Sequence, residues 1–372
     1  MEIHQFHTSI QFGDAISDEI FSIRRILRNW GYRSHVFTEY WDEESAREVL
    51  RFERYERYCM PSNVVIIHYS AWASPISYAL GLPERKILVY HNSTPAEYFA
   101  PYDENPAHWP GWSVSRPSEW LRHCKHMLPA CTDKVDLVLG DSSFNRDEAI
   151  QAGAKRAGVL PILINWDRFT GPVDGEFLEK ISQGPPKLLF VGRISPNKCQ
   201  HDLVRMMECY TQVLGRDGRL LLVGDEYNLP MYRNFVRSLA ATQVPGKVIM
   251  TGKVTEDQLR ACYKAASVFV CMSEHEGFCV PILEAMHNDI PVVACAAGAI
   301  EETMNGAGVL LRTKDPLAVA KVADALIRDR EFREAVLQTQ RERVDRLRHV
   351  DAENWLEAAL TTLFALERCD GK

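Results

Sequence analysis

Short runs of apolar residues recur along the whole chain, and they constrain the fold more than any other feature of the sequence. They are Val64–Ile67, Ile87–Tyr90, Leu137–Leu139, Val159–Ile162, Leu188–Val191, Leu220–Val223, Val248–Met250, Val268–Cys271 and Val292–Ala294. The runs do not alternate with polar residues, which is typical of parallel strands covered on both faces. Amphipathic helical patterns, such as residues 202–214, lie between them. This alternation occurs twice and predicts an α/β fold with two Rossmann-like, doubly wound domains.

Glycine and proline mark the boundary between the two predicted domains. A chain of 372 residues favours two domains of ordinary size, and Gly171–Pro186 is rich in residues that interrupt helices and strands. We therefore predict an N-terminal Rossmann-like domain over residues 1–172 and a C-terminal one over residues 173–347. The two are expected to face a central cleft at the carboxyl ends of their strands, where open α/β sheets bind ligands.

Two helical patterns close the chain. One helix is expected over residues 316–347. A second is expected over about 352–366, with apolar residues at roughly helical spacing: Trp355, Leu356, Ala359, Leu360, Leu363 and Leu366. An apolar stripe of this kind needs a surface to cover. We therefore expect residues 348–372 to pack back on the N-terminal domain.

Composition and charge exclude several classes of protein. The formal net charge of −7 argues against a general nucleic-acid binder, which needs a basic surface. No apolar run approaches the ~18 residues of a membrane-spanning helix, and the first residues lack the features of a signal peptide. The ten cysteines contain no CxxC pair, as expected for free thiols in a reducing compartment. We expect a cytoplasmic protein, with the inner face of the membrane as an alternative location.

The loop that follows the strand Leu188–Val191 carries two cations. Gly192 permits a sharp turn at the strand end, and Arg193 and Lys198 precede a predicted helix whose N-terminus also favours anions. A planar guanidinium fork and an ammonium point charge together suit a diphosphate. A solvated basic loop without a ligand is the alternative interpretation.

A second loop follows the strand Val268–Cys271 and carries two acids. Glu276 is expected in the loop, and Glu284 about one turn inside a helix that has Pro281 in its first turn. The loop would present backbone amides toward an anion. These amides belong to Gly277, Phe278, Cys279 and Val280. A carboxylate here can accept hydrogen bonds from sugar or ribose hydroxyls, although Glu284 could equally be a helix acid favoured by the dipole.

The spacing of Glu276 and Glu284 resembles the E-x7-E signature of the family 4 retaining glycosyltransferases, whose fold is called GT-B. The resemblance extends over nearly the whole chain, and an ordered set of segments at strand ends carries it. These segments are Phe190–Arg193 with Lys198, Leu221–Asp225, Thr251–Val254, and Gly298 with Glu301.

The resemblance implies a role for each matching residue of the C-terminal domain. Arg193 and Lys198 would bind the diphosphate of a nucleotide sugar, Glu276 would hold the transferred sugar, and Glu284 would bind the ribose. The amides of residues 277–280 would contact the phosphate or the sugar, and Val254 would meet the nucleobase through backbone atoms. Cys279 stands where glycine is common in the family, which narrows this part of the site.

Two further resemblances concern the N-terminal domain. Gly13 stands where the family often has a Gly-Gly loop near the phosphates, but here Asp14 replaces the second glycine. His91, after the strand Ile87–Tyr90, is similar to the histidine that the family places beside the sugar of the nucleotide-sugar donor. Its expected role is to polarise or orient a hydroxyl and not to act as a strong base; a structural histidine is the alternative.

Two basic helical segments could contact the acceptor. Ile16–Trp30 is expected to point Arg24, Arg25 and Arg28 outward, and Trp120–Met127 mixes basic and aromatic residues. Either could meet an anionic lipid-diphosphate acceptor or a membrane surface. Ordinary solvated helices are the alternative.

The expected activity is retaining, metal-independent transfer of a hexose-type sugar from a GDP- or UDP-sugar to a glycan or lipid-linked acceptor, in polysaccharide or glycoconjugate synthesis. The sequence contains no D-x-D triplet and no HExxH motif, so Arg193 and Lys198 would stabilise the leaving diphosphate without a cofactor. A nucleotide-sugar epimerase and a non-enzymatic sugar-nucleotide binding protein stay open. The lack of a G-x-G-x-x-G motif counts against a nicotinamide oxidoreductase.

Overall fold

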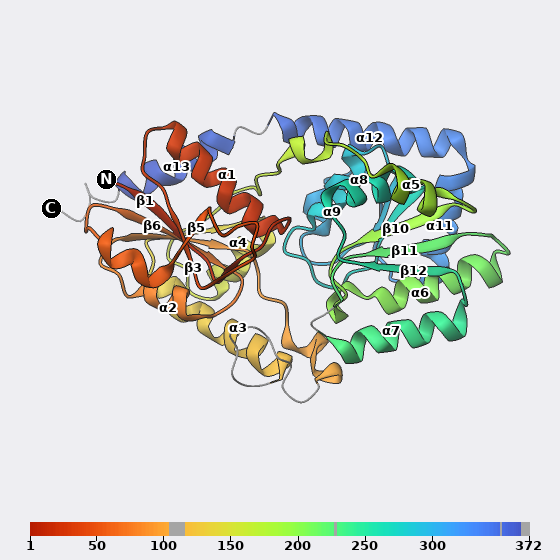
Figure 1. Ribbon diagram of the computed structural model, residues 1–372, viewed down its shortest axis with the longest axis horizontal. Coiled ribbons are helices and arrows are strands. Elements are labelled where there is room, and N and C mark those ends of the chain that lie inside the picture. Colours follow the sequence, from red (N-terminus) through yellow and green to blue (C-terminus); the bar gives the residue numbers. More distant parts are fainter. Residues whose placement is uncertain (104–115, 227–228, 350–351, 366–372) are drawn as a thin grey trace. The chain divides into compact units, whose positions relative to one another are not determined.

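The computed structural model describes residues 1–103, 116–226, 229–349 and 352–365, and these form two compact α/β units (Figure 1). The N-terminal unit comprises Met1–Pro95, Glu119–Asn165 and Val350–Lys372. The C-terminal unit comprises Ala96–Ser118 and Trp166–His349. Residues 96–103 thus group with the C-terminal unit, a grouping that nothing in the sequence indicates.

The N-terminal unit is built on a seven-stranded sheet in which all neighbouring strands are parallel. Its strand order is β5 (Val49–Arg51), β3 (Val36–Thr38), β1 (Ile3–Phe6), β6 (Val64–Tyr69), β7 (Arg85–Tyr90), β8 (Leu137–Gly140) and β9 (Ala157–Val159). A short parallel pair, β2 (Ser9–Ile10) and β4 (Tyr40–Trp41), lies apart from it. The order reverses between β1 and β6. The last strand ends at Val159, whereas the sequence predicted one beginning there.

Helices cover both faces of this sheet, because alternate residues of the buried strands point to opposite sides (Figure 1). On one face α1 (Ala15–Asn29) and α13 (Ala352–Ala365) share a core with Ile66 and Ile87. On the other face α2 (Ser74–Leu80), α3 (Pro117–Asp133) and α4 (Ser143–Gln151) pack on Ile67 and Leu88. Four residues of the predicted apolar stripe, Leu356, Ala359, Leu360 and Leu363, are buried in the first core. Trp355 is exposed instead, and Leu366 lies outside the described residues.

The C-terminal unit has a six-stranded, wholly parallel sheet. Its order is β12 (Val248–Gly252), β11 (Arg219–Val223), β10 (Lys187–Val191), β13 (Val268–Cys271), β14 (Val292–Cys295) and β15 (Val309–Leu311). The predicted doubly wound topology is therefore present in both units. In this sheet the order reverses between β10 and β13.

The helices of the C-terminal unit form two layers around the sheet (Figure 1). One layer contains α5 (Gly175–Ser182), α8 (Glu256–Ala265), α9 (Val280–His287) and α12 (Arg330–Arg348), and the other contains α6 (Gln200–Glu208), α7 (Pro230–Gln243) and α11 (Pro316–Arg328). A short helix, α10 (Ile300–Met304), follows β14. The single helix predicted over residues 316–347 is wrong. Asp329 separates α11 from α12, because its side chain accepts the free amides of Glu331 and Phe332 and starts a new helix.

Candidate functional site

Two loops of the C-terminal unit leave the sheet at the point where its strand order reverses. From β10 the chain passes outward to β11 and β12, and then returns to place β13 on the other side of β10. β10 and β13 pair in parallel, with Leu188 opposite Val268. The loops 192–199 and 272–279 therefore start from neighbouring strand ends. This is where open α/β sheets bind their ligands.

Asn197 links these two loops. Its side-chain amide donates to the carbonyl of His275 over 3.1 Å, and its own carbonyl accepts from the amide of Glu274 over 2.8 Å. The side chain of Asn197 is buried and also accepts from the Ser195 hydroxyl over 2.6 Å. Sequence analysis did not select Asn197, because its contacts join residues far apart in the chain. The loop with the cations and the loop with the acids thus form one unit of structure.

Lys198 and Glu276 form an ion pair across the two loops. The Lys198 ammonium donates to the Glu276 carboxylate, whose side chain is only 5% exposed. Burial, the largest single influence, would lower the pKa of Lys198, but the Glu276 carboxylate together with the nearby Cys279 and Cys271 thiols outweighs it and the pKa is raised. The Lys198 ammonium is therefore held charged beside Glu276.

Gly298 fixes the backbone of Glu276. A Cβ at Gly298 would lie 2.3 Å from the Glu276 carbonyl oxygen and 3.0 Å from its amide nitrogen, and the φ angle of Gly298 is +52°. The next residue, Ala299, donates its amide to the same carbonyl over 2.9 Å. Only glycine fits such a close approach. Glu301, the other residue of this part of the resemblance, is exposed and pairs with Arg312.

Glu284 is buried in α9 with two partners that the sequence did not reveal. The Tyr263 hydroxyl donates to Glu284 Oε2, and Arg168 Nη1 lies 3.8 Å from Oε1. Burial raises the pKa of Glu284, while Arg168 and Tyr263 act in the opposite direction. Arg168 also binds Glu256, with Nε donating to Oε2 over 2.7 Å. Glu284 is therefore a positioned acid and not a solvated helix residue.

The segment between the two acids leads into α9. Cys279 is the N-cap residue of this helix and adopts a left-handed conformation, with φ +71° and ψ +62°. Phe278 is buried, and its carbonyl accepts from the Thr303 hydroxyl. Val280 begins the helix. Gly277 to Val280 thus lie at a helix N-terminus, where backbone N–H groups favour an anion.

The turn at Gly192 is enforced by close packing of backbone. Gly192 has φ +154°, and a Cβ on Gly224, at the end of neighbouring β11, would lie 2.3 Å from the Gly192 carbonyl oxygen. Arg193 follows with an exposed side chain, and among the described residues no ion pair involves it. Arg193 is therefore available to an anion, in contrast to Lys198.

Val254 and Gly13 occupy loops at other strand ends. Val254 is half-buried and comes directly after β12, which ends at Gly252 with φ +70°. Gly13 has φ +80° and precedes α1. Asp14 caps this helix by accepting the amide of Ser17 over 3.2 Å. The departure from a Gly-Gly pair thus has a local structural reason.

His91 lies in a buried chain of polar groups in the N-terminal unit. Its Nδ1 is 2.9 Å from Asp141 Oδ2, and its Nε2 is 2.9 Å from Nδ1 of His68. His68 Nε2 in turn lies 2.9 Å from Gln5 Oε1. Gln5, His68, His91 and Asp141 come from β1, β6, the end of β7 and the end of β8, which are neighbours in the sheet. Both ring nitrogens of His91 are therefore engaged inside the unit.

The direction of the hydrogen bonds in this chain of polar groups follows from Gln5, the residue at one end of it. Gln5 Nε2 donates to the carbonyl of Ile20 over 3.0 Å, so Gln5 Oε1 must accept from His68 Nε2. Nδ1 of a neutral His68 is then the acceptor toward His91. The other ring nitrogen of His91, Nδ1, faces the Asp141 carboxylate.

Glu19 of α1 supplies a second buried carboxylate beside this ring. Its Oε2 lies 3.6 Å from His91 Nδ1, and neither of its oxygens accepts a well-formed hydrogen bond. Burial raises the pKa of Glu19 well above its usual value; the nearby Asp141 carboxylate adds to this, and the Leu163 amide opposes it. Burial also keeps the pKa of His68 well below its ordinary value. Glu19 therefore keeps its proton to a higher pH than an exposed glutamate does, and the His68 ring stays neutral.

Among the described residues, three groups of side chains have the donor atoms to hold a metal ion. They are Cys199, His201 and Asp202; Cys271, Glu276 and Cys279; and Glu19, His91 and Asp141. In the first two groups a protein cation already meets the carboxylate, since Lys314 lies 2.6 Å from Asp202 and Lys198 binds Glu276. In the third group the His91 ring contacts Asp141.

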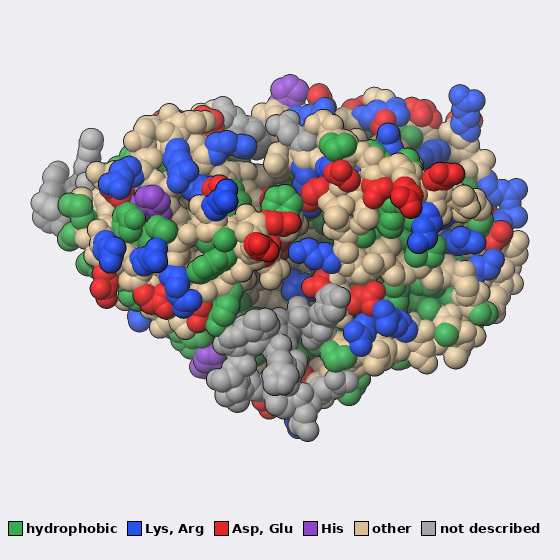
Figure 2. Space-filling view, viewed as in Figure 1, with side chains coloured by type: hydrophobic (Ala, Val, Ile, Leu, Met, Phe, Trp, Pro, Cys, Tyr) green, Lys and Arg blue, Asp and Glu red, His purple; other side chains and the backbone are tan. Residues whose placement is uncertain are grey.

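The two basic helical segments are only partly exposed. Arg24 was expected to point outward, but it is buried because its guanidinium binds the carboxylate and the carbonyl of Glu48. Arg25 is exposed, and Lys125 of α3 pairs with Glu148 over 2.7 Å. Figure 2 shows basic and acidic side chains interspersed on both units. Among the described residues, no helix is long and apolar enough to cross a membrane.

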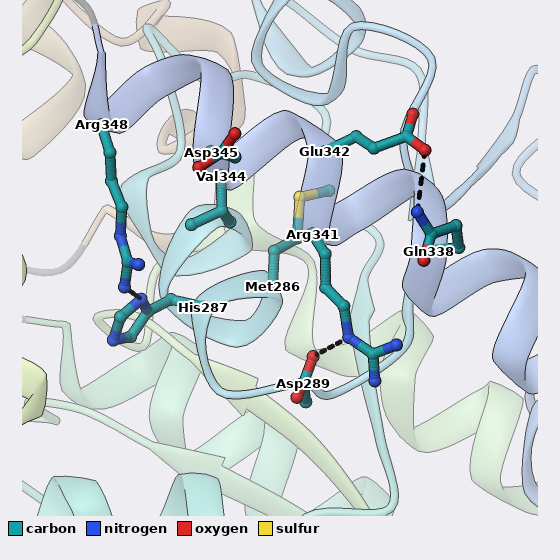
Figure 3. A pocket seen from close by; sticks show the side chains of 9 residues that line it. All are labelled: Met286, His287, Asp289, Gln338, Arg341, Glu342, Val344, Asp345 and Arg348. Carbon is teal, nitrogen blue, oxygen red and sulfur yellow. Dashed lines mark hydrogen bonds and ion pairs between the residues drawn. The ribbon is translucent and has the colours of Figure 1, made fainter.

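A pocket of about 510 Å³ lies elsewhere on the C-terminal unit, between the end of α9 and α12 (Figure 3). Its charged residues are paired with one another: Arg341 donates to Asp289 over 2.8 Å, and Arg348 contacts His287 over 2.8 Å. None of the predicted site residues lines it. The pocket is therefore separate from the two loops at the switch point.

Comparison with known proteins points to one class of enzyme. Residues 176–343 match the family model described as "Glycosyl transferases group 1", and this range falls within the C-terminal unit. The sulfoquinovosyl transferase SQD2 of Arabidopsis thaliana is 27% identical over 278 residues, which are 70% of this chain and 48% of that protein. The GDP-mannose:cellobiosyl-diphosphopolyprenol alpha-mannosyltransferase of Xanthomonas oryzae pv. oryzae is 32% identical over 143 residues, 37% of either chain. The chain thus spans about half the length, or less, of these curated relatives.

Similarity to solved structures extends over nearly the whole chain. The sucrose-phosphate synthase tll1590 of Thermosynechococcus elongatus superposes with a TM-score of 0.72 at 17% identity, covering 98% of this chain and 100% of that one. At this level of identity the likeness concerns the fold. It confirms the predicted GT-B fold with two Rossmann-like domains.

Proposed function

We propose that this chain is a retaining glycosyltransferase of family 4, which moves a hexose-type sugar from a GDP- or UDP-sugar to an acceptor hydroxyl. The observation that carries the proposal is the junction of two loops at the switch point of the C-terminal sheet. One loop bears Arg193 and Lys198, and the other bears Glu276. The match of residues 176–343 to a glycosyltransferase family model supports the same function.

The proposed roles follow from charge and position. Arg193, exposed and unpaired among the described residues, would bind the diphosphate first. Lys198 would join it by exchanging part of its contact with Glu276. Glu276 would then accept hydrogen bonds from hydroxyls of the transferred sugar. Glu284, positioned by Tyr263, would bind the ribose, and the backbone near Val254 would meet the nucleobase.

The reaction would proceed on one face of the sugar. The acceptor oxygen attacks the anomeric carbon, the bond from that carbon to the diphosphate oxygen breaks, and the acceptor proton passes to the leaving phosphate. Arg193, Lys198 and the helix N-terminus at Cys279 would stabilise the charge that develops on the diphosphate. This stabilisation needs no metal ion. The double displacement of glycosidases fits less well, because both acids lie in one segment of one unit.

His91 keeps a proposed place beside the sugar. Both of its ring nitrogens are already bonded. It would therefore contact a sugar hydroxyl by exchanging its bond to His68 or to Asp141. Catalytic contacts often tighten only when the substrate is bound.

The acceptor is proposed to be a glycan or a lipid-linked glycan, in polysaccharide or glycoconjugate synthesis. The relative from Xanthomonas is named for a diphosphopolyprenol acceptor, and this supports a lipid-diphosphate as the first acceptor to test. The exposed Arg25 and the basic residues of α3 are the proposed contacts for such an acceptor, or for the surface of the membrane that carries it.

The test begins with a thermal-shift screen of GDP-, UDP- and ADP-sugars, since a bound ligand raises stability by mass action. The stabilising nucleotide sugar is then incubated with candidate acceptors in the presence of EDTA, and the anomeric configuration of the product is read by NMR. Retention without added metal is expected. Turnover of the nucleotide sugar without any acceptor would instead indicate an epimerase.

Glu276→Gln and Glu274→Gln form a matched pair for this assay. Both acids lie in the same loop, but Glu274 has an exposed side chain that binds Lys314. Loss of one catalytic polar group typically costs about 100-fold in rate, and we expect this loss for Glu276→Gln alone. Transfer by Glu276→Gln at the wild-type rate would refute the assignment of this acid.

A further inference from the structure

Two thiols flank the acid that is proposed to hold the sugar. Cys271 ends β13, and Cys279 is the N-cap residue of α9, so that Glu276 lies in the loop between them. The two sulfur atoms and one carboxylate oxygen of Glu276 all lie within 4.8 Å of one another. Both cysteines are free thiols. Two cysteines of one functional loop are thus close enough to react with each other after a small movement.

The surroundings favour a thiolate on one member of this pair. A hydrogen bond between the two thiols lowers the pKa of Cys271, although burial and the Glu276 carboxylate oppose this. The same bond, burial and Glu276 raise the pKa of Cys279, and the Lys198 ammonium offsets this only in part. Cys271 is therefore the member of the pair that attacks first. The thiolate is the form that attacks oxidants and disulfides.

A metal ion is a poorer occupant of this position than a disulfide. The only oxygen ligand of the group, the Glu276 carboxylate, already binds the Lys198 ammonium. A cation would have to displace this ammonium from the carboxylate. Formation of a bond between the sulfurs needs no such exchange of charge.

We propose that Cys271 and Cys279 form a reversible disulfide that closes the nucleotide-sugar site under oxidising conditions. This inference rests on the proposed function of the loop. With hydrogen peroxide as the oxidant, the Cys271 thiolate attacks a peroxide oxygen, the O–O bond breaks, and a sulfenic acid and hydroxide form. The hydroxide takes the proton of the Cys279 thiol and becomes water. The Cys279 thiolate then attacks the sulfenic sulfur, the S–O bond breaks, and the oxygen leaves as hydroxide, which the proton first lost by Cys271 converts to water. In sum, two thiols and one peroxide give one disulfide and two waters.

The disulfide would act on the site through backbone displacement. A disulfide requires sulfurs about 2.05 Å apart, which draws the N-cap of α9 toward the end of β13. Cys279 is adjacent to Phe278 and Val280, whose backbone belongs to the proposed phosphate site. Misplacement of such a site by about 1 Å can cost about 100-fold in rate. We expect a loss of this order, which reducing agents such as dithiothreitol reverse.

The test uses the full chain, treated with hydrogen peroxide and then unfolded in an alkylating agent. Peptide mass spectrometry identifies the linked cysteines, and sugar transfer is measured before oxidation, after it, and after reduction. Cys271→Ser removes one partner and should abolish both the linked peptide and the peroxide-dependent loss of transfer. Cys209→Ser, at a half-buried cysteine after α6, is the matched control and should behave as the wild type.

The outcomes separate this inference from the proposed function. A Cys271–Cys279 peptide, together with reversible loss of transfer, supports both. Absence of that peptide at peroxide levels that oxidise other thiols of the chain overturns the disulfide, even if the reduced protein is active. If the linked peptide forms but the reduced protein transfers no sugar, the disulfide is supported and the proposed function is refuted. A linked peptide with transfer unchanged refutes closure of the site.

Discussion

The Nε2 atom of His91 lies 2.9 Å from Nδ1 of His68, and this contact ends a hydrogen-bond chain that begins at a backbone oxygen. The Ile20 carbonyl can only accept, so Gln5 donates to it from Nε2, and Gln5 Oε1 accepts from His68 Nε2. Because burial keeps the pKa of His68 well below its ordinary value, the ring is neutral and its Nδ1 is the acceptor toward His91. A single backbone oxygen therefore sets the tautomer of His68.

The first prediction concerns the tautomer of His68. We expect the ¹⁵N NMR signals of its ring to show a proton on Nε2 and none on Nδ1 at neutral pH, because Gln5 Oε1 accepts from Nε2. Burial keeps the pKa of His68 well below its ordinary value, so the ring should stay neutral when the solution is made mildly acidic. Gln5→Leu removes the acceptor of the Nε2 proton and should shift that proton toward Nδ1, whereas Gln11→Leu, at an exposed glutamine, should behave as the wild type. A proton on Nδ1 of His68 in the wild type would disprove the proposed bond directions.

The second prediction concerns Glu19 and the pH dependence of stability. Because the folded-state pKa of Glu19 is raised by burial and by Asp141, the folded protein binds a proton that the unfolded chain has released above its ordinary pKa. This contribution to stability is complete below the unfolded pKa and is lost as pH rises through the folded pKa.

Glu19→Gln keeps the shape of the side chain and removes this titration. The amide that replaces the carboxyl group has no proton to lose, so the variant should lack the decline that the wild type shows as pH rises and should be the more stable of the two at alkaline pH. Urea unfolding between about pH 5 and 9 measures this. Glu44→Gln, at an exposed acid, should follow the wild type. Parallel pH curves for Glu19→Gln and the wild type would contradict the raised pKa.

The third prediction uses two glycines with positive φ. Gly298→Ala places a Cβ 2.3 Å from the Glu276 carbonyl oxygen, whereas Gly306→Ala, at φ +83°, meets nothing within 4 Å. In both variants the left-handed conformation lowers the free energy of unfolding by about 1 to 2 kcal/mol. Only Gly298→Ala must also displace Glu276. We expect urea unfolding to show a larger loss for Gly298→Ala, and sugar transfer to fall only in that variant. Equal effects would show that Gly298 does not position the acid.

The fourth prediction concerns the hydroxyl of Tyr263. This hydroxyl and Arg168 partly offset the burial that raises the pKa of Glu284, so Tyr263→Phe should raise that pKa further. The ionised carboxylate is the form that accepts hydrogen bonds from ribose. When the solution is acidified, the affinity of Tyr263→Phe for UDP or GDP should therefore begin to fall at a higher pH than that of the wild type.

Calorimetric titration with the nucleoside diphosphate between about pH 5 and 8 tests this shift. Tyr210→Phe, at another buried tyrosine of the C-terminal unit, controls for loss of a hydroxyl as such. If the affinity of Tyr263→Phe for the nucleoside diphosphate fell at the same pH as that of the wild type, Glu284 would not be the acid that binds the nucleotide.

Much of the fold could be predicted because its central strands are covered on both faces and so are apolar throughout. The search for continuously apolar runs did not predict β1. Its polar residues His4 and Gln5 interrupt the run, yet all four residues of the strand are buried. Gln5 is polar because it anchors the His68 chain, a reason that becomes visible only when β1 lies beside β6. The break at Asp329 was missed because capping outweighed a continuous helical pattern.

The candidate site was predictable in its residue types and not in its pairings. Strand-end position and spacing indicated Arg193, Lys198, Glu276 and Glu284. The ion pair between Lys198 and Glu276 joins residues 78 positions apart, and no local pattern encodes it. No local pattern predicts the hydrogen bond from Tyr263 to Glu284 either, because the sequence of α8 presents Tyr263 as an ordinary core residue.

The burial of α13 in the core of the N-terminal unit has a consequence for synthesis on the ribosome. Leu356, Leu360 and Leu363 complete a core whose other members come mostly from the first 160 residues. Domains generally fold in the order in which they emerge, but here the N-terminal unit lacks one of its helices until the whole C-terminal unit has been translated. The C-terminal unit can therefore reach its native state earlier, and the nascent N-terminal sheet, with one face partly uncovered, is where a chaperone would be expected to bind.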